Sequence, residues 1–473
     1  MTVELELREA AFFERDVRLR MPFRFGVVTL TTAPQAFVRA RVRLADGREG
    51  EGWAAELLVP KWFDKSPHLS NEENFDQLRR SLALAAAAYR GQPGFRTPFG
   101  LHAAASAEVA QAAQAAGLPD LVAGFGPALL DRAMLDAVLR LTGTSVFAAA
   151  RDNLFGLDAS LTPDLGGFDL PRFLAGLGPN ELIHVRHTVG LADPLTADDL
   201  AVENRVGDGL PETLEEVIRA YSVTHFKLKV GGDLEADLDR LTQIAAILDM
   251  LPDYRVTLDG NEQYANVDGA LALWEAIGAA PELGRLCQRV LFVEQPIVRT
   301  EALERDIADL ARLTPVEIDE SDAELDAFVR ARELGYTGVS SKSCKGFYRS
   351  LLNRARCAAW NDGAGARRYF MSAEDLTTQA GLAVQQDLAL AGLIGCSHVE
   401  RNGHHYVNGM AAAPEAEQTR FLEAHPDLYH RRHGAVRLDI RDGALRLGSR
   451  DGAGLASGAL PDVAALEPRD YGA

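Results

Sequence analysis

Apolar and polar residues alternate near the start of the chain, as they do in β-strands. The segments VELELREAAFF and QAFVRARVRLADGREGEGWAA both show this alternation, and Asp46-Gly47 supplies a hairpin turn. From about residue 72 to 150 the pattern becomes helical and rich in alanine, and its clearest helix ends at Gly143. We therefore predict an α+β domain over residues 1–180.

Short apolar strands then alternate with longer amphipathic helices from about residue 182. The predicted strands end near His187, Lys229, Asp259, Glu294, Asp319, Lys342, Ser372 and Val399. Eight such units predict an α/β fold, a (β/α)8 barrel, over residues 181–415. The tail, residues 416–473, contains the hairpin-like GAVRLDIRDGALRL and is expected to return to the N-terminal domain.

The composition limits the kinds of molecule that the protein is expected to bind. The 473 residues include 68 acidic and 49 basic side chains, a net charge of −19, which argues against binding nucleic acid or an anionic membrane surface. The four cysteines form no CxxC motif, the acidic N-terminus does not resemble a signal peptide, and no apolar run approaches the ~20 residues of a membrane span. We expect a cytoplasmic protein.

Five consecutive predicted strands end in a charged residue. The segments are FKLKV, RVTLDGN, VLFVEQP, PVEIDES and GVSSKSCKG, which carry Lys229, Asp259, Glu294, Asp319 and Lys342. Successive intervals of 30, 35, 25 and 23 residues each correspond to about one β–α unit. These side chains are therefore expected at the C-terminal rim of a barrel, where active sites are built.

The three acidic residues predict a cation site. Any one of Asp259, Glu294 and Asp319 alone is more simply a turn or helix-capping residue. Together, in a poorly solvated site, three carboxylates must become neutral or hold a cation. All-oxygen ligands favour Mg²⁺, with Mn²⁺ possible, and Glu320 is an alternative ligand in its segment.

The lysines suggest proton transfer. Lys227 and Lys229 are two apart on a strand, so they share a face at roughly 7 Å. Mutual repulsion and a nearby cation are expected to lower a lysine pKa towards neutrality, which suits a general base. Lys342 comes from the far side of the ring, and Lys345 is either a further amine or a solvated loop residue.

The ordered set KLK, LDGN, VEQP, IDES and SSKSCK, with PFRFG near the start and DIRDGALRL near the end, resembles the enolase superfamily. The resemblance is nearest to its muconate-lactonising and mandelate-racemase branches and covers nearly the whole chain. It implies a modified barrel with an N-terminal capping domain completed by the tail. It also implies Mg²⁺ held by Asp259, Glu294 and Asp319, Lys229 as acid/base supported by Lys227, and Lys342 as the opposing acid/base.

The implied substrate is a small-molecule carboxylate that loses its α-proton to give a metal-stabilised enediolate. Racemisation or epimerisation, β-elimination or cycloisomerisation then follows, in an enzyme of the lyase or isomerase class that is expected to be a homo-oligomer. Capping loops around Arg24 and residues 61–63 are expected to close the site. The residues expected to contact substrate are Asn261, Lys345, Glu374, His398, Glu400 and Trp62.

Other interpretations stay open. Lys342 is also a candidate Schiff-base lysine of a barrel aldolase, although this leaves the three carboxylates unexplained. A non-catalytic family member that binds metal is a third possibility. The segments MSAEDLTTQAG and HVERNGHHYVNG depart from the patterns of the two branches, so the substrate is not identified, and HVERNGHH is a weaker candidate for a second metal site.

Overall fold

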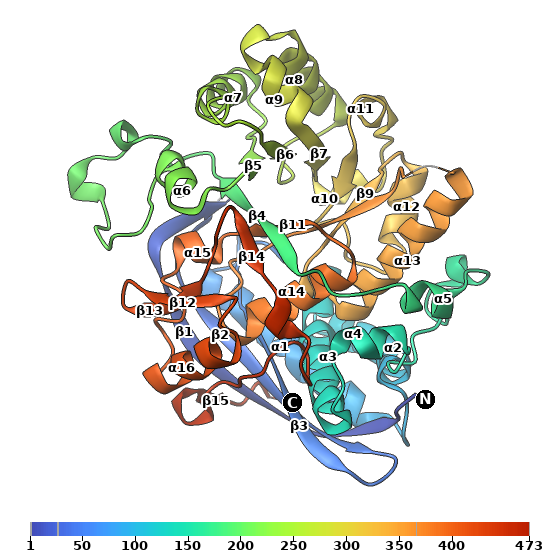
Figure 1. Cartoon of the computed structure of the whole chain (residues 1–473). Helices are drawn as coiled ribbons and strands as arrows, with labels where there is room; N and C mark the ends of the chain where they lie inside the picture. The colour runs from blue at the N-terminus through green and yellow to red at the C-terminus, as the bar shows by residue number, and fades with distance from the viewer. Residues whose placement is uncertain (1, 26–27, 366, 473) are drawn as a thin grey trace.

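The computed structural model describes residues 2–25, 28–365 and 367–472. At the N-terminus, β1 (Leu5–Phe25), β2 (Val28–Leu44) and β3 (Glu49–Leu57) form an antiparallel sheet. Helices α1 (Asn71–Gly91), α2 (Pro98–Ala115) and α3 (Asp120–Thr142) follow, and α3 packs on β2 and β3 (Figure 1). This α+β unit is the predicted capping domain.

Eight parallel strands follow, and each carries its C-terminal end to the same rim. They are β4 (Leu182–Val189), β5 (His225–Lys229), β6 (Arg255–Asp259), β7 (Val290–Glu294), β8 (Val316–Ile318), β9 (Gly338–Ser341), β10 (Phe370–Ala373) and β11 (His398–Arg401). Their hydrogen-bonded order is β10-β9-β8-β7-β6-β5-β4-β11, and the end strands β10 and β11 contact each other. The predicted barrel fold is confirmed, with strand ends within two residues of those expected.

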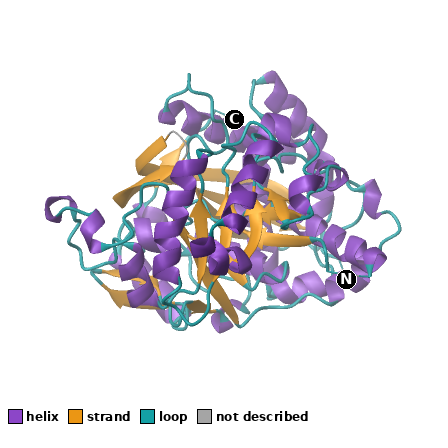
Figure 2. Cartoon of the chain, turned by 90° about the horizontal axis from the view of Figure 1, so that it is seen from above, coloured by secondary structure: helices purple, strands orange, loops and turns teal. Residues whose placement is uncertain are grey.

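Helices surround these strands, as Figure 2 shows. The helices that follow α3 and precede the tail are α4 (Val146–Arg151), α5 (Leu170–Ala175), α6 (Leu214–Tyr221), α7 (Leu234–Leu248), α8 (Val267–Ala279), α9 (Gly284–Arg289), α10 (Arg299–Ala302), α11 (Ala308–Ala311), α12 (Ala327–Glu333), α13 (Phe347–Ala364), α14 (Leu382–Leu393) and α15 (Gly403–Tyr406). Among the residues described, no helix is both long and apolar enough to cross a membrane.

The tail contacts both parts of the molecule. It contains α16 (Glu415–Ala424), the hairpin of β12 (Tyr429–Arg432) and β13 (Ala435–Leu438), β14 (Ala444–Arg446) and β15 (Glu467–Arg469). Strand β14 pairs with β4 of the barrel, and β15 pairs with β1 of the N-terminal sheet. The exact domain boundaries at residues 180 and 415 stay predictions.

Alternation along β5 explains why two lysines lie inside a protein. Phe226 and Leu228 are fully buried on the outer, helix-covered face of the strand. Lys227 and Lys229 consequently face the barrel interior. The register then places Lys229 beside Asp259, and Asp259 beside Glu294.

Candidate active site

The predicted charged residues meet at one end of the barrel. Lys229, Asp259 and Glu294 are the last residues of β5, β6 and β7. Asp319 and Lys342 come directly after β8 and β9. All of these except Lys229 are buried. Their charges are therefore stabilised by one another rather than by water.

Lys227 occupies the centre of this group. Its Nζ lies 2.9 Å from Asp259, 2.8 Å from Glu294 and 3.0 Å from both Glu374 and Glu400. The carboxylates come from four different strands or strand ends, so only the closed barrel brings them together. One ammonium group thus partly compensates four buried anions.

Lys229 and Lys342 lie on opposite sides of this centre. The Nζ of Lys229 is 2.5 Å from Asp259, and the side chain is 15% exposed, against 3% for Lys227. The Nζ of Lys342 is 2.5 Å from Asp319 and 4.9 Å from the ring centroid of Trp62, a cation–π distance. Two lysines on separate strands are therefore available to one site.

The prediction that mutual repulsion lowers a lysine pKa is wrong for Lys227. Burial by itself lowers a lysine pKa, but the surrounding carboxylates raise the pKa of Lys227 well above its ordinary value. Asp319 and Glu294 likewise raise the pKa of Lys342 despite its burial. Asp259 and Glu294 contribute most to the rise for Lys227, and Glu374 and Glu400, from the ends of β10 and β11, add to it.

A small cavity of about 30 Å³ lies between the lysines. Its capping-domain side is formed by Phe23, Val59 and Trp62. The barrel side is formed by Lys227, Lys229, Asp259, Asn261, Asp319, Lys342, Asp375, Leu376, Glu400 and Asn402. The space suits about one water, so a carboxylate substrate requires the capping side to move.

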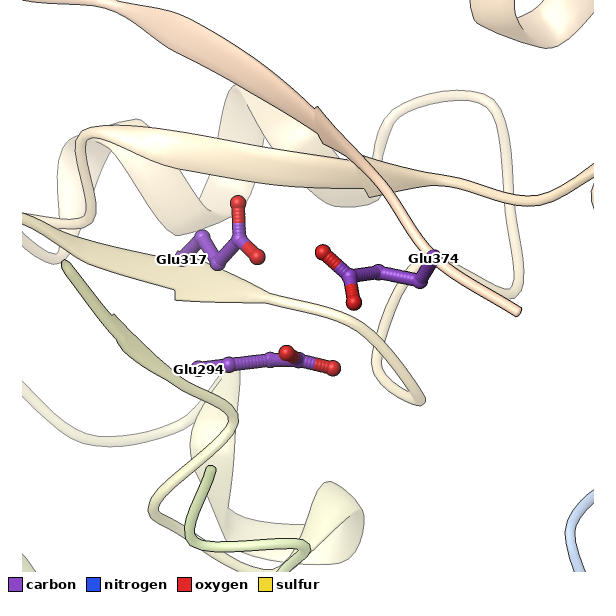
Figure 3. A group of neighbouring side chains, drawn as sticks. All are labelled: Glu294, Glu317 and Glu374. Atoms are coloured by element: carbon purple, nitrogen blue, oxygen red, sulfur yellow. The ribbon is translucent and has the colours of Figure 1, made fainter. Parts of the chain in front are cut away.

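Three glutamates converge beside the cavity, as Figure 3 shows. Oxygens of Glu294, Glu317 and Glu374 lie within 4.8 Å of one another, the arrangement expected of metal ligands. Glu294 Oε2 and Glu317 Oε2 are buried and have no hydrogen-bond partner among the described residues. Burial raises the pKa of both carboxyls well above the ordinary range. Unsatisfied carboxylate oxygens of this kind fit a hard divalent cation.

This group shares only Glu294 with the predicted ligand set. Asp259 and Asp319 instead accept hydrogen bonds from Lys229 and Lys342. The register explains why Glu317 belongs to the group, because Glu317 and not Asp319 is the neighbour of Glu294 across β7 and β8. The segment PVEIDES did contain a signal, since Glu317 and Asp319 are two apart and share a face.

Sequence reasoning also missed Arg186 on β4. Its guanidinium is fully buried, pairs with Glu374 and lies 2.6 Å from His398 Nδ1. Burial opposes its charge, but Glu374 raises the pKa of Arg186 further above its ordinary value. The alternation of IHVRH, which places Arg186 on the inner face, was the available signal.

The residues expected to contact substrate divide into two groups. Trp62, Asn261 and Glu400 line the cavity. Lys345, Glu374 and His398 do not line it in this structure: Lys345 donates to Ser340 at 2.8 Å, and Glu374 and His398 contact Arg186.

Two of the remaining predicted residues are held by local contacts. Glu320, the alternative metal ligand, accepts from Asn261 at 2.9 Å, and burial and Asp319 raise its pKa to about 7. Lys61 donates to the carbonyl of Ser66 at 2.7 Å, and the side chain of Arg24 lies outside what the structure describes.

The histidines of HVERNGHH lie outside the barrel wall, except His398. His404 and His405 pack around His187, with ring centroids 5.6 and 5.0 Å from it. Among the residues described, these three rings do not bring their nitrogens together at the spacing of metal ligands. They remain a buried aromatic cluster, and burial lowers the pKa of His187 to about 4.

An eight-stranded barrel with acidic and lysine side chains at its C-terminal rim, covered by an α+β domain, defines a class of barrel enzymes. Residues 209–457, more than half of the chain, match the family model described as enolase C-terminal domain-like. The chain belongs to this family, and hence to the enolase superfamily of isomerases and lyases. The resemblance seen in the sequence is confirmed.

Solved structures agree with this fold over nearly the full length. A muconate lactonizing enzyme from Mycobacterium smegmatis, complexed with muconolactone, is 19% identical with a TM-score of 0.60, covering 98% of this chain and 100% of that one. A mandelate racemase/muconate lactonizing enzyme from Bordetella bronchiseptica is 19% identical with a TM-score of 0.57, covering 98% of each chain. An enolase superfamily member from Roseovarius nubinhibens is 18% identical, with a TM-score of 0.57 and coverages of 98% and 96%. No curated protein matches the sequence.

Proposed function

We propose that this enzyme removes the proton α to the carboxylate of a small-molecule substrate, with a divalent cation, Mg²⁺ or Mn²⁺, bound beside the reacting carbon. The observation that carries the proposal is that Lys229 and Lys342 line one cavity from separate strands, with Asp259 and Asp319 between them. A planar intermediate in this cavity would present one face to each lysine. Proton removal on one face and proton return on the other then need no large movement.

The residues present fit a cation, because Glu294 Oε2 is buried and unpartnered. We assign Asp259, Glu294 and Asp319 as its ligands. Asp259 and Asp319 line the cavity, and Glu294 does not line it but is the register neighbour of Asp259. A cation there supplies positive charge next to the oxygens on which negative charge develops. To bind it, both aspartates must exchange a lysine hydrogen bond for the cation.

The lysines then have distinct tasks. Lys229, the more exposed, takes the α-proton on one face, and Lys342 gives a proton from Nζ on the other face; for the mirror-image substrate the two roles are exchanged. Lys227 stays charged and offsets the carboxylates around it. The Schiff-base alternative is disfavoured because it leaves the carboxylates of Asp259, Glu294 and Asp319 without a task.

The test is deuterium uptake from D₂O at the α-carbon, with Mg²⁺ present, across a panel of sugar acids, N-acyl amino acids and dipeptides. We expect exchange that is lost in chelator and in Glu294→Gln. Lys229→Met and Lys342→Met should each reduce exchange by roughly 10²–10⁴-fold for substrate attacked from that side. With enantiomerically pure substrates, each variant should retain exchange from the face that the other lysine serves.

Two results would overturn the proposal. Exchange that persists unchanged in chelator and in Glu294→Gln would remove the cation. Borohydride trapping of a substrate on Lys342 would establish Schiff-base chemistry instead.

A further inference from the structure

A second cavity, of about 210 Å³, lies between the capping domain and the barrel. Helices α2 and α3 form one side, and the segments after β8 and β9 form the other. At the ~30 Å³ that a water takes in the liquid, it holds roughly seven waters. Its apolar lining includes Val109, Ala110, Ala113, Leu118 and Pro127.

Three polar side chains on three helices meet at this cavity. Asp131 of α3 lies 2.8 Å from Nδ1 of His102 on α2, and it accepts a hydrogen bond of 2.9 Å from the hydroxyl of Tyr89 on α1. Asp131 and Tyr89 are each only 1% exposed. The Tyr89 hydroxyl also lies 2.9 Å from His102 Nδ1, and because its own proton goes to Asp131, it accepts from the ring. The proton of a neutral His102 ring is therefore on Nδ1, and Nε2 is left as an acceptor.

Nothing in the described part of the chain uses that acceptor. Nε2 of His102 makes no hydrogen bond to described residues, and it is not among the buried unpartnered atoms. The side chain is 19% exposed and lines the cavity. A buried carboxylate that orients an imidazole towards an open space is the arrangement by which proteins present a histidine nitrogen to a ligand.

Charges at the cavity mouth do not select for a charged ligand. Asp120 and Glu324 line it and are exposed, and Arg349, which donates to the backbone carbonyl of Asp322, supplies a positive charge. With both signs present, the apolar walls and the acceptor nitrogen determine what binds. The required ligand is small, largely apolar and able to donate a hydrogen bond.

We propose that this cavity binds a small molecule with an apolar body and a hydroxyl or amino head group that donates to Nε2 of His102. The site is separate from the proposed reaction, although Lys345 lines the cavity and also lies 3.4 Å from Asp319. Its occupancy can be measured without any catalytic assay.

The test uses probes of one shape and different heads: cyclohexanol, cyclohexylamine and cyclohexanone. Binding is followed by NMR of ¹³C-labelled alanine methyls, since Ala110, Ala113, Ala123 and Ala128 line the cavity. At pH 8.5, where histidine side chains are ordinarily neutral, we expect saturable shifts with cyclohexanol. Cyclohexanone, which only accepts hydrogen bonds, should bind roughly threefold to tenfold more weakly. Cyclohexylamine carries a positive charge at this pH and should bind more weakly than cyclohexanol, because the apolar walls do not solvate its charge.

Three substitutions test whether the probes bind in this cavity. Ala110→Trp, at the exposed mouth, should abolish the shifts, whereas Gln111→Trp, exposed on the same helix but not lining the cavity, should leave them. His102→Phe should remove the preference for alcohol over ketone, with folding checked by circular dichroism. Equal binding of alcohol and ketone to the wild type, absence of saturable shifts, or binding that survives Ala110→Trp would each overturn the proposal.

Discussion

Two buried polar clusters lie on opposite sides of the same stretch of barrel wall. Arg186 and Glu400 are register partners and face the charged interior, whereas His187 and Arg401, one residue further on, face outwards. Inside, carboxylates keep Lys227 charged although burial opposes it. Outside, burial dominates and lowers the pKa of His187 to about 4, so that its ring stays neutral. Burial is common to both clusters, and the partners decide the protonation state.

Among the described residues, the carboxylates of Asp375 and Asp387 pair with Arg401 rather than with the histidines of the outer cluster. The pKa of His404 and His405 is lowered well below the ordinary value, first by burial and then by neighbouring histidines and by the arginines Arg437 and Arg20. Several imidazole nitrogens there have no hydrogen-bond partner among the described residues. Loss of the Lys227 ammonium group should therefore destabilise the inner cluster. Protonation of a histidine should destabilise the outer cluster.

Removing the ammonium group of Lys227 should have the largest effect on stability. Lys227→Met leaves four carboxylates without their shared ammonium group and should lower the free energy of unfolding by about 3–5 kcal/mol in chelator. Urea denaturation measures this. Lys229→Met is the matched control, because that side chain is partly exposed and its described ion pairing is to Asp259. Equal losses in the two variants would contradict a special role for Lys227.

Two substitutions should locate the cation. If Asp259, Glu294 and Asp319 hold it, Asp319→Asn should weaken Mn²⁺ binding by at least about tenfold, or about 1.4 kcal/mol, while Glu317→Gln changes it little. Electron paramagnetic resonance of free Mn²⁺ gives the affinities without an activity assay. The reverse order would place the cation between Glu294, Glu317 and Glu374, the group in Figure 3.

Acid should destabilise the protein through the outer cluster. The pKa of His187 is about 4 in the folded protein against an ordinary ~6.5, so the unfolded chain takes up the proton first as the pH falls. Stability present above pH ~6.5 is thus lost towards pH 4, at up to ~1.4 kcal/mol per pH unit for this one group. His187→Phe keeps an aromatic ring against His404 and His405 and should lose less stability between pH 7 and pH 5. Urea denaturation at each pH measures this difference. An equal loss of unfolding free energy in the wild type and in His187→Phe would contradict this origin.

The smallest expected effect concerns the capping side of the cavity. Trp62→Leu removes the ring beneath the Lys342 ammonium, a contact of about 0.5–2 kcal/mol. Deuterium exchange from the face that Lys342 serves should fall by roughly threefold to thirtyfold, less than in Lys342→Met. A Trp62→Leu variant as impaired as Lys342→Met would show that Trp62 does more than position the lysine.

Strand periodicity was sufficient to predict most of the site. The strand ends at Lys229, Asp259 and Glu294 follow from local alternation and from intervals of one β–α unit, so they required no knowledge of distant contacts. Glu317 and Arg186 were missed because each becomes part of the site through its neighbours on other strands. The register between β7 and β8, for example, pairs Glu317 with Glu294.

The sequence by itself determined the order of strands and helices, the family, and the set of charged residues at the barrel rim. Tertiary structure alone decided their ionisation. The carboxylates of Glu374 and Glu400 reach Lys227 from 147 and 173 residues away. Together with Asp259 and Glu294, which contribute more, they raise the pKa that neighbouring lysines were expected to lower. The same is true of the Asp131–His102 pair, whose helices are adjacent only in the folded capping domain. Electrostatic energies depend on distance in space and on burial, and neither quantity is present in a one-dimensional pattern.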